Sequence, residues 1–348
     1  MRKHSIVITG LFFFFAVLTF FIEACKKADL LANTTPLNFS VPNGFPATNY
    51  DFAGNPLTKE GFELGRKLFY EGKLSKDGNF PCGSCHQQAA AFATVDHDLS
   101  HGFDNQFTTR NTPPLFNLAW YKEFHADGGI NHLDVQPLAP ITAPNEMAED
   151  INNVIRKLKE DATYPTLFKA AFGTEDITSE RLFRALSQFM VHMVSANAKY
   201  DKMKRGELMF TANEQAGYTL FKAKCASCHA EPLFTDLSYR NNGLSMNASL
   251  KDRGRMRITG DRKDSLKFKV PSLRNVAVSA PYMHDGRFFD LYTVLNHYSN
   301  GINNSPTLDA QLTNKIPLTI LEKEYLVIFL QTLTDSAFIH NKQFEQPR

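Results

Sequence analysis

Two short stretches of the sequence share one reactive pattern, C-x-x-C-H. The stretches PCGSCHQQ and KCASCHAEP contain Cys82, Cys85 and His86, and Cys225, Cys228 and His229. In this pattern the two thiols form thioethers with the vinyl groups of a haem, and the adjacent imidazole is the proximal iron ligand. A zinc ribbon would place its cysteine pairs roughly 15 to 20 residues apart, and a redox dithiol needs no histidine after the second cysteine. The sequence therefore predicts two covalently attached c-type haems.

The N-terminus has the pattern of an export signal. Arg2 and Lys3 precede an apolar run, 6–22, and Ala24 stands directly before Cys25. This resembles a bacterial lipoprotein signal, with cleavage before Cys25 and a lipid on its thiol. The run is also long enough to be an uncleaved membrane anchor. Both alternatives place the remaining chain on the periplasmic side, tethered to the membrane through this segment alone.

Cysteine count and composition narrow the class of protein. The two motifs use four of the five cysteines and the lipoprotein pattern uses Cys25, so no thiol remains for a structural disulfide. With 43% hydrophobic residues, 21% charged residues and a net charge of +2, the chain has the composition of a globular protein. This balance argues against a nucleic-acid partner bound through a basic surface.

The elements that must position the two motifs are predicted to be helices. LTKEGFELGRKLF and FTANEQAGYTLF precede the first and second motif, and both end in G-x-x-L-F. The second begins with a capping box formed by Thr211 and Glu214. ITSERLFRALSQFMVHMVS and LTILEKEYLVIFLQTLT also have helical periodicity, and the latter is expected to bury Leu318, Leu321, Tyr325 and Ile328. We predict an all-α fold of two cytochrome c-like domains, each around one haem.

Five stretches of the chain resemble the bacterial dihaem cytochrome c peroxidases and their MauG-type relatives. They are SHGF (100–103), RNTPPLFN (110–117), DGGINHLDVQPLAPITAPNEM (127–147), KFKVPSLRNVAVSAPYMHDGRF (267–288) and LNHYSNG (295–301). The sequence predicts a signal segment at 1–25, a flexible tether rich in Asn, Thr and Pro at 26–50, and two haem domains at 51–200 and 201–348. The resemblance implies that the N-terminal domain is peroxidatic and that the C-terminal domain transfers electrons.

For the first haem, the resemblance implies His101 as a distal ligand that leaves before peroxide binds. Three other histidines, His97, His125 and His132, lie nearby in the sequence. The resemblance also implies Glu146 as the catalytic carboxylate and Gln136 as its amide companion. Breaking the peroxide bond requires moving a proton between its two oxygens, which one positioned acid/base can do. Alternatively, Glu146 only favours the dipole of a following helix from its first turn.

For the second haem, a predicted helix at 290–301 supplies the distal ligand. Leu291, Val294, Leu295 and Tyr298 share its apolar stripe, whereas His297 is expected to point about 100° away. The MauG type has tyrosine at this register and many peroxidases have methionine. A tyrosinate ligand lowers the haem potential relative to a thioether. The alternative is that Tyr298 is core packing and that Met283 or Met256 is the ligand.

The resemblance further implies a calcium ion between the domains, held by Asn111 and by the carbonyls of Ser279 and Pro281. So few protein oxygens would leave several waters in the shell, which suits Ca²⁺. The chain departs from its relatives at Ala126, where they usually have a tryptophan that relays electrons between the haems. Trp120 or Phe124 could fill that gap.

These observations lead to one expected function and two alternatives. The expected function is a cytochrome c peroxidase that reduces hydrogen peroxide to water with electrons from a small c-type cytochrome or cupredoxin. The first alternative is a MauG-like enzyme that oxidises side chains of a partner protein through high-valent iron. The second is a dihaem electron-transfer cytochrome with no catalysis.

Overall fold

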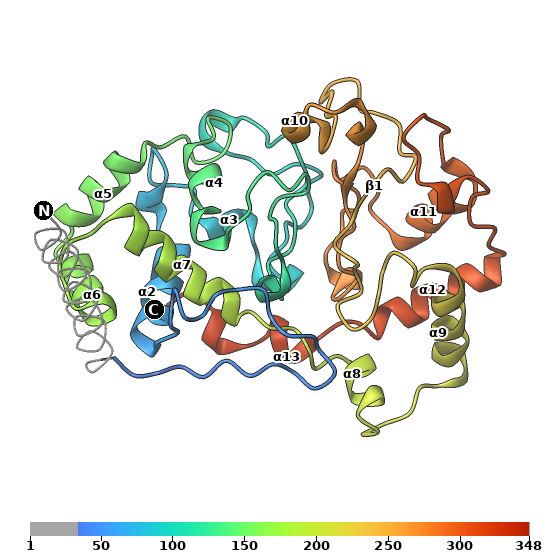
Figure 1. Ribbon diagram of the computed structural model, residues 1–348, viewed down its shortest axis with the longest axis horizontal. Coiled ribbons are helices and arrows are strands. Elements are labelled where there is room, and N and C mark those ends of the chain that lie inside the picture. The colour runs from blue at the N-terminus through green and yellow to red at the C-terminus, as the bar shows by residue number, and fades with distance from the viewer. Residues whose placement is uncertain (1–33, 348) are drawn as a thin grey trace, which may run out of the picture.

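The structure, a computed structural model, describes residues 34–347 and is mostly helical, as predicted (Figure 1). The first half contains α2 (Lys59–Phe69), α3 (Cys82–Cys85), α4 (Leu138–Thr142), α5 (Ile151–Glu160), α6 (Thr163–Phe172) and α7 (Ser179–His192). The link α8 (Lys199–Lys204) leads to α9 (Ala212–Lys224), α10 (Met256–Thr259), α11 (Leu291–Asn296), α12 (Ile320–Gln331) and α13 (Ser336–Ile339). Two antiparallel two-residue strands, β1 (Tyr239–Arg240) and β2 (Phe268–Lys269), form the only sheet among the described residues.

The repeated G-x-x-L-F sequence marks the same packing device in both halves. Gly65 of α2 lies against the carbonyl of Ala185 in α7, and Gly217 of α9 lies against the carbonyl of Tyr325 in α12. A Cβ at either glycine would collide with that backbone oxygen. Each helix that leads to a haem motif therefore crosses its partner helix at close range, which only glycine allows.

Threonine side chains define where the leading helices begin. Thr58 accepts a hydrogen bond from the backbone N–H of Gly61 and caps α2. Thr211 and Glu214 form the predicted capping box of α9. Such caps contribute on the order of 1 kcal/mol each, because they satisfy backbone donors that the helix leaves unpaired.

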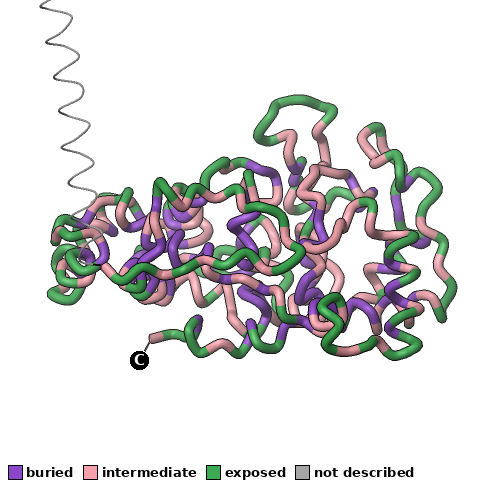
Figure 2. Tube along the Cα trace, turned by 60° about the horizontal axis from the view of Figure 1, so that its bottom comes forward, coloured by how far each residue is buried: buried purple, intermediate pink, exposed green. Residues whose placement is uncertain are grey.

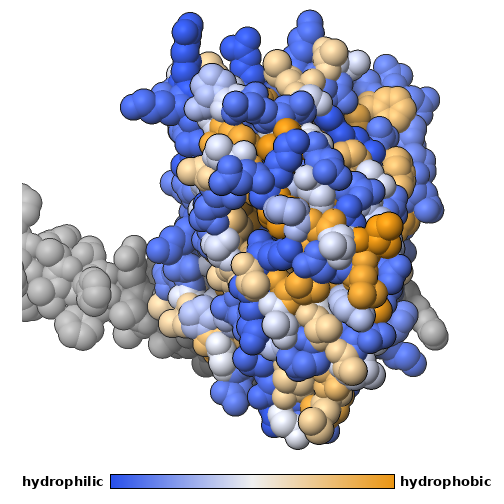
Figure 3. All heavy atoms as spheres, turned by 90° about the vertical axis from the view of Figure 1, so that its right-hand side faces the viewer, coloured by the Kyte–Doolittle hydropathy of each residue, from blue (hydrophilic) through white to orange (hydrophobic). Residues whose placement is uncertain are grey.

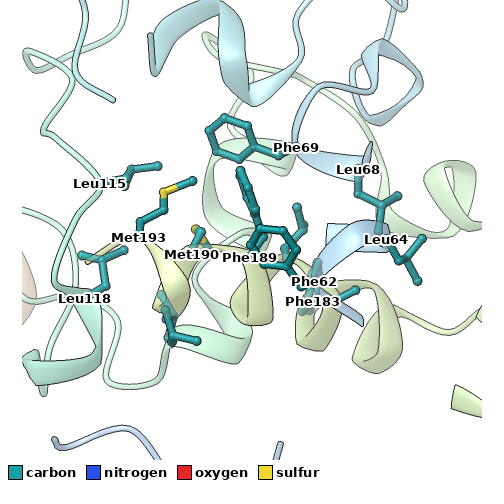
Figure 4. Packing of buried hydrophobic residues seen from close by; sticks show 14 of the residues in the cluster. Phe62, Leu64, Leu68, Phe69, Leu115, Leu118, Phe183, Phe189, Met190 and Met193 are labelled. Atoms are coloured by element: carbon teal, nitrogen blue, oxygen red, sulfur yellow. The ribbon is translucent and has the colours of Figure 1, made fainter. Parts of the chain in front are cut away.

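The core of the first half contains aliphatic, aromatic and methionine side chains, many of them from α2 and α7 (Figure 4). Phe69 and Phe189 pack at a tilted angle with ring centroids 5.2 Å apart, and both are fully buried. Truncating one of these rings to alanine would cost about 3–5 kcal/mol of stability. This core forms the base on which the first haem motif rests.

In α12 the predicted helix is present but its buried face is different. Leu326, Phe329 and Leu330 are buried, whereas Leu321, expected to be buried, is 52% exposed. The apolar side chains of α12 lie on all sides of the helix, so periodicity alone does not identify the face that packs on α9. The prediction of the buried face was wrong for this reason.

Two segments near the ends of the described chain pack onto the first half. Residues 34–50, the described part of the predicted flexible tether, are docked: Phe45 lies 5.1 Å from the ring of Trp120, whose Nε1 donates to the carbonyl of Pro46 at 2.8 Å. At the other end of the chain, Phe338 and Phe344 join the first core. The last residues thus leave the C-terminal half, to which the sequence assigned them, and return to the N-terminal half (Figures 1 and 2).

Between residues 34 and 347, no helix is long and apolar enough to cross a membrane. The predicted signal segment and Cys25 lie outside the described residues.

Candidate functional site

The first C-x-x-C-H motif lines a hollow that opens to solvent. Helices α2 and α7 supply its apolar floor, and the loops at 100–112 and 136–147 supply polar side chains. The structure thereby brings together the residues predicted for one site, namely Cys82, Cys85, His86, His101, Gln136 and Glu146.

The imidazole of His86 is oriented as a proximal ligand requires. Its Nδ1 hydrogen-bonds the backbone carbonyl of Phe92 at 2.7 Å. Because that carbonyl can only accept, the proton is on Nδ1 and the Nε2 lone pair is available for a metal. Burial lowers the pKa of His86 to about 4, which keeps the ring neutral. The buried thiols of Cys82 and Cys85 border the same hollow, so the residues present fit a covalently attached haem.

Glu146 lies in the turn before α5 and outside that helix, which is capped by Asp150. The alternative in which Glu146 only favours a helix dipole from the first turn is therefore wrong. Its side chain lines the hollow, where burial raises the pKa of the carboxyl group. Gln136 lines the same hollow, with its Nε2 atom 3.4 Å from Nε2 of His125.

The loop that carries His101 is tied closely to the Glu146 turn. His101 itself is exposed at the rim of the hollow, with its ring 4.5 Å from that of Phe107 and 5.2 Å from that of His97. The next residue, Gly102, touches the Glu146 backbone so closely that a Cβ would come within 2.7 Å of the Glu146 Cα. Only glycine has enough room at this position, and its lack of a side chain lets the backbones of the two loops pack in direct contact.

The second motif repeats the proximal arrangement. Nδ1 of His229 lies 3.2 Å from the carbonyl of Phe234 and 3.1 Å from that of Pro271. Burial lowers the pKa of this imidazole and keeps the ring neutral, so the lone pair of Nε2 is again available for a metal. Burial also raises the pKa of both neighbouring thiols, those of Cys225 and Cys228. The two haem motifs therefore have matching geometry.

Tyr298 lies beside the second pair of thiols. The pKa of its phenol is raised to about 12, mainly by burial, and the nearby thiols of Cys225 and Cys228 contribute to this rise. The helix changes at this point, because α11 continues into a π-helix at His297–Gly301. The extra residue per turn shifts the facing of the side chains that follow.

His297 is buried, against its prediction, because the segment that contains Asn242 packs against it. It was expected to point away from the buried side, but it is 6% exposed and its Nε2 hydrogen-bonds the carbonyl of Asn242 at 3.0 Å. The carbonyl only accepts, so Nε2 carries the proton and is not free for iron. The geometry thus leaves the phenol, and not the adjacent imidazole, next to the thiols.

Asn111 contacts the segment that contains the other predicted calcium ligands. Its Nδ2 lies 2.6 Å from the carbonyl of Pro281, and its buried Oδ1 has no hydrogen-bond partner among residues 34–347. A buried unpaired amide oxygen is costly unless something binds it. The orphaned oxygen therefore fits a cation held between the two halves.

Arg110 joins the two halves close by. Its guanidinium contacts Asp127 of the first half at 2.7 Å and Asp252 of the second half at 2.5 Å, and all three side chains are largely buried. The ring of Phe268 lies under the guanidinium and stacks on His284 with centroids 3.9 Å apart. The interface is therefore a desolvated polar network, and the cost of breaking it is high.

The two residues expected to replace the relay tryptophan near Ala126, Trp120 and Phe124, lie in different surroundings. Trp120 is buried beneath residues 39–46. Phe124 instead stacks on Tyr121 with centroids 6.5 Å apart, and the backbone N–H of Lys269 donates to the Ala126 carbonyl at 2.7 Å. The Lys269 ammonium lies 5.4 Å from the Tyr121 ring, and burial lowers its pKa to about 8.

Two residues at these sites were not predicted from the sequence as site residues. His125 borders Gln136, and its position next to the family stretch that begins at Asp127 could have indicated this. Asn242 contacts His297 and Tyr298 but lies in a stretch with no recognisable motif. Only the folded structure reveals it.

Comparison with known proteins identifies the family of this chain. A family model described as di-haem cytochrome c peroxidase matches residues 59–209. The methylamine utilization protein MauG of Methylorubrum extorquens is 36% identical over 283 residues, which cover 80% of this chain and 79% of that protein. The cytochrome c551 peroxidase of Nitrosomonas europaea is 33% identical over 238 residues, which cover 67% and 71%.

A solved structure gives the same result for the fold. The crystal structure of a MauG-like protein associated with microbial copper homeostasis matches with a TM-score of 0.81 and 32% identity, covering 89% of this chain and 99% of that one. Relatives named as MauG and relatives named as cytochrome c peroxidase both match over most of the chain. With its two haem motifs, the chain belongs to the dihaem cytochrome c peroxidase and MauG family.

Proposed function

We propose that the protein is a dihaem peroxidase that reduces hydrogen peroxide to water at the first haem site, with electrons that enter through the second. One observation carries this proposal: Glu146, a carboxylic acid with a raised pKa, lines the same hollow as the proximal His86 and the haem-binding thiols. A haem bound there would supply the electrons that break the peroxide bond. The protein has to supply a proton at the correct place.

Glu146 would move that proton. Burial disfavours its charged form and raises the pKa of the carboxyl group, so Glu146 is suited to take a proton from bound peroxide and return it to the leaving oxygen. Gln136 would donate its amide N–H to the substrate oxygen, and His125 at 3.4 Å would fix the direction of that amide. Leu115, Leu186 and Met190 line the hollow and would limit the entry of water.

His101 would act as a removable group at the mouth of the hollow. Its backbone carbonyl lies 3.9 Å from Sγ of Cys85, so the loop borders the first haem motif. Its side chain is exposed, which would permit it to move without disturbing the core. We infer that His101 binds in the oxidised protein and leaves before peroxide enters.

The electron donor would dock at the end of the molecule that contains the second motif (Figure 3). Ser227, inside that motif, is exposed, so this haem site borders the surface. Phe289, Tyr292 and Leu321, which belong to or flank α11 and α12, are exposed hydrophobic residues. Exposed apolar side chains near a redox site suit a short-lived complex with a small c-type cytochrome or cupredoxin.

We further propose that Ca²⁺ binds between the two halves through Asn111 and the carbonyls of Ser279 and Pro281. The orphaned Asn111 Oδ1 supports this site, and oxygen ligands suit Ca²⁺. Dialysis against a calcium chelator would then lower the thermal unfolding temperature, and added Ca²⁺ would restore it. No change on chelation would contradict the site.

The location proposed is the periplasmic side of the membrane. Covalent c-type haems and the N-terminal export pattern both favour it, and a lipid on Cys25 would tether the protein. Mass spectrometry of the membrane-extracted protein would detect the lipid on Cys25. An intact N-terminus beginning at Met1 would favour the uncleaved anchor.

A second candidate is a MauG-like enzyme that oxidises side chains of a partner protein. Tyr298 favours it, because a tyrosinate ligand stabilises oxidised iron more than a thioether does. The two candidates differ in their turnover: fast oxidation of a reduced small cytochrome by peroxide supports the peroxidase, whereas slow turnover with cross-linking of a specific protein supports the second candidate.

The direct experiment uses purified protein with both haems attached. Peroxide-dependent oxidation of a reduced c-type cytochrome would support the proposal. If peroxide and cyanide leave the spectrum unchanged even after one-electron reduction, the protein is an electron-transfer cytochrome and the peroxidase proposal fails.

A further inference from the structure

Asn242 lies between two side chains that could each serve as a ligand of the second haem. Its Nδ2 is 3.4 Å from Sδ of Met283. The same side chain is close enough to the phenol of Tyr298 to oppose the rise in pKa that burial causes, as an N–H that faces a phenol oxygen does. A thioether and a phenol therefore converge on one amide.

The orientation of this amide is fixed by the backbone. The N–H of Leu244 donates to Oδ1 of Asn242 at 3.2 Å, which assigns the oxygen to the Leu244 side. The amide nitrogen has two hydrogens and must face the other way. The amide nitrogen donates to the Met283 sulfur, and the same NH₂ group is close to the Tyr298 phenol.

The main chain of Asn242 is also held. His297 donates from Nε2 to the Asn242 carbonyl at 3.0 Å, and this imidazole belongs to the π-helix that contains Tyr298. Any movement of Asn242 would thus move the segment that carries the phenol. The amide and the π-helix form one unit.

Met283 reaches this amide from an unusual backbone conformation. Its φ is +73°, in the left-handed region that residues other than glycine rarely adopt. A strained residue persists only where its surroundings hold it, and such residues cluster at functional sites. Here the neighbouring Tyr282 N–H donates to the carbonyl of Phe288 at 2.7 Å and holds the turn closed.

We propose that Asn242 is a positioning residue that selects the ligand of the second haem, keeping Tyr298 in place and Met283 in reserve. This rests on the part of the proposed function in which Tyr298 faces that haem. An N–H donor stabilises a negatively charged phenol oxygen, while the other N–H engages the sulfur and keeps it from the iron. Without the amide, the phenol loses its donor and the thioether is released.

The test uses the oxidised protein with both haems attached, magnetic circular dichroism and a redox titration of the second haem. In Tyr298→Phe, Met283 should replace the phenol, so that a thioether charge-transfer band appears in the whole population and the midpoint potential rises. In Tyr298→Phe/Met283→Leu that band should be lost and the second haem should become high-spin. The exposed methionine variant Met246→Leu is the matched control and should resemble the wild type.

Asn242→Leu tests the selector itself. It should convert part of the population from tyrosinate to thioether ligation, and the thioether fraction should vanish in Asn242→Leu/Met283→Leu. Asn242→Asp has the same shape with no amide N–H and should shift the population in the same direction, which provides a test if the leucine variant does not fold.

Two results would overturn the proposal: no thioether band in Tyr298→Phe, or unmixed tyrosinate ligation in both Asn242 variants. None of these measurements uses peroxide or an electron donor. A protein without peroxidase turnover can therefore still show ligand selection, and an active peroxidase can lack it. Identical spectra in the wild type and Tyr298→Phe would show that the phenol does not face the haem.

Discussion

The backbone N–H of Phe103 donates to the carbonyl of Glu146 at 2.7 Å. Through this bond the loop that carries His101 and the turn that carries the carboxylate are held together, although they are about 40 residues apart in the sequence. The removable group and the acid/base at the first haem are therefore mechanically coupled in the proposed function.

Gly102→Ala should disturb this coupling. The φ of Gly102 is −118°, which alanine can adopt, so the added Cβ acts only through its collision with the backbone of Asn145 and Glu146. We expect a loss of about 1–3 kcal/mol in the free energy of unfolding and a lower rate of peroxide reduction. Denaturant unfolding and steady-state turnover measure the two effects.

A second glycine provides the control for this variant. Gly78 has φ of +80° and nothing within 4 Å of an added Cβ, so Gly78→Ala introduces backbone strain without a collision. It should lower stability by about 1 kcal/mol and leave the peroxide kinetics unchanged. Equal kinetic effects at both glycines would contradict the coupling.

The pH dependence of peroxide reduction should follow Glu146. Burial penalises the carboxylate, so its pKa lies above that of an ordinary glutamate. The base that accepts the peroxide proton is present only above this raised pKa, and the rate should fall as the pH decreases through it. Stopped-flow rates between pH 4 and 8 would show this limb. A limb that persists unchanged in Glu146→Gln would belong to another group.

Arg110→Met should weaken the contact between the two halves. The substitution leaves Asp127 and Asp252 buried without their cation, which costs about 3–5 kcal/mol. Calorimetry should therefore give a lower unfolding temperature. Arg156→Met is the matched control, because the Arg156–Glu160 pair is exposed and should contribute less than about 1 kcal/mol. Similar losses in both variants would contradict the buried network.

Local sequence signals predicted the parts of the fold that depend on neighbouring residues. Thr211 and Glu214 cap the helix that leads to the second motif, and the residues of the first C-x-x-C-H motif line one hollow. The glycines of G-x-x-L-F were visible as a repeat, but their role at a helix crossing needed the partner carbonyls of Ala185 and Tyr325.

The remaining features depend on contacts between distant residues. The docking of residues 34–50 and the return of Phe338 to the first core have no local signature. The burial of His297 depends on its contact with Asn242, which is 55 positions away. Asn242 reaches Met283 and Tyr298 from 41 and 56 positions away.

The most direct measurement compares wild type and Glu146→Gln, each with two attached haems, in peroxide-dependent oxidation of a reduced c-type cytochrome. The amide keeps the size of the side chain but cannot exchange a proton at the hollow lined by His86 and Gln136. We predict turnover in the wild type and a loss of about 10²- to 10⁴-fold in the variant, with unchanged haem spectra. Equal rates in the two proteins, or no turnover in the wild type, would contradict the proposed function.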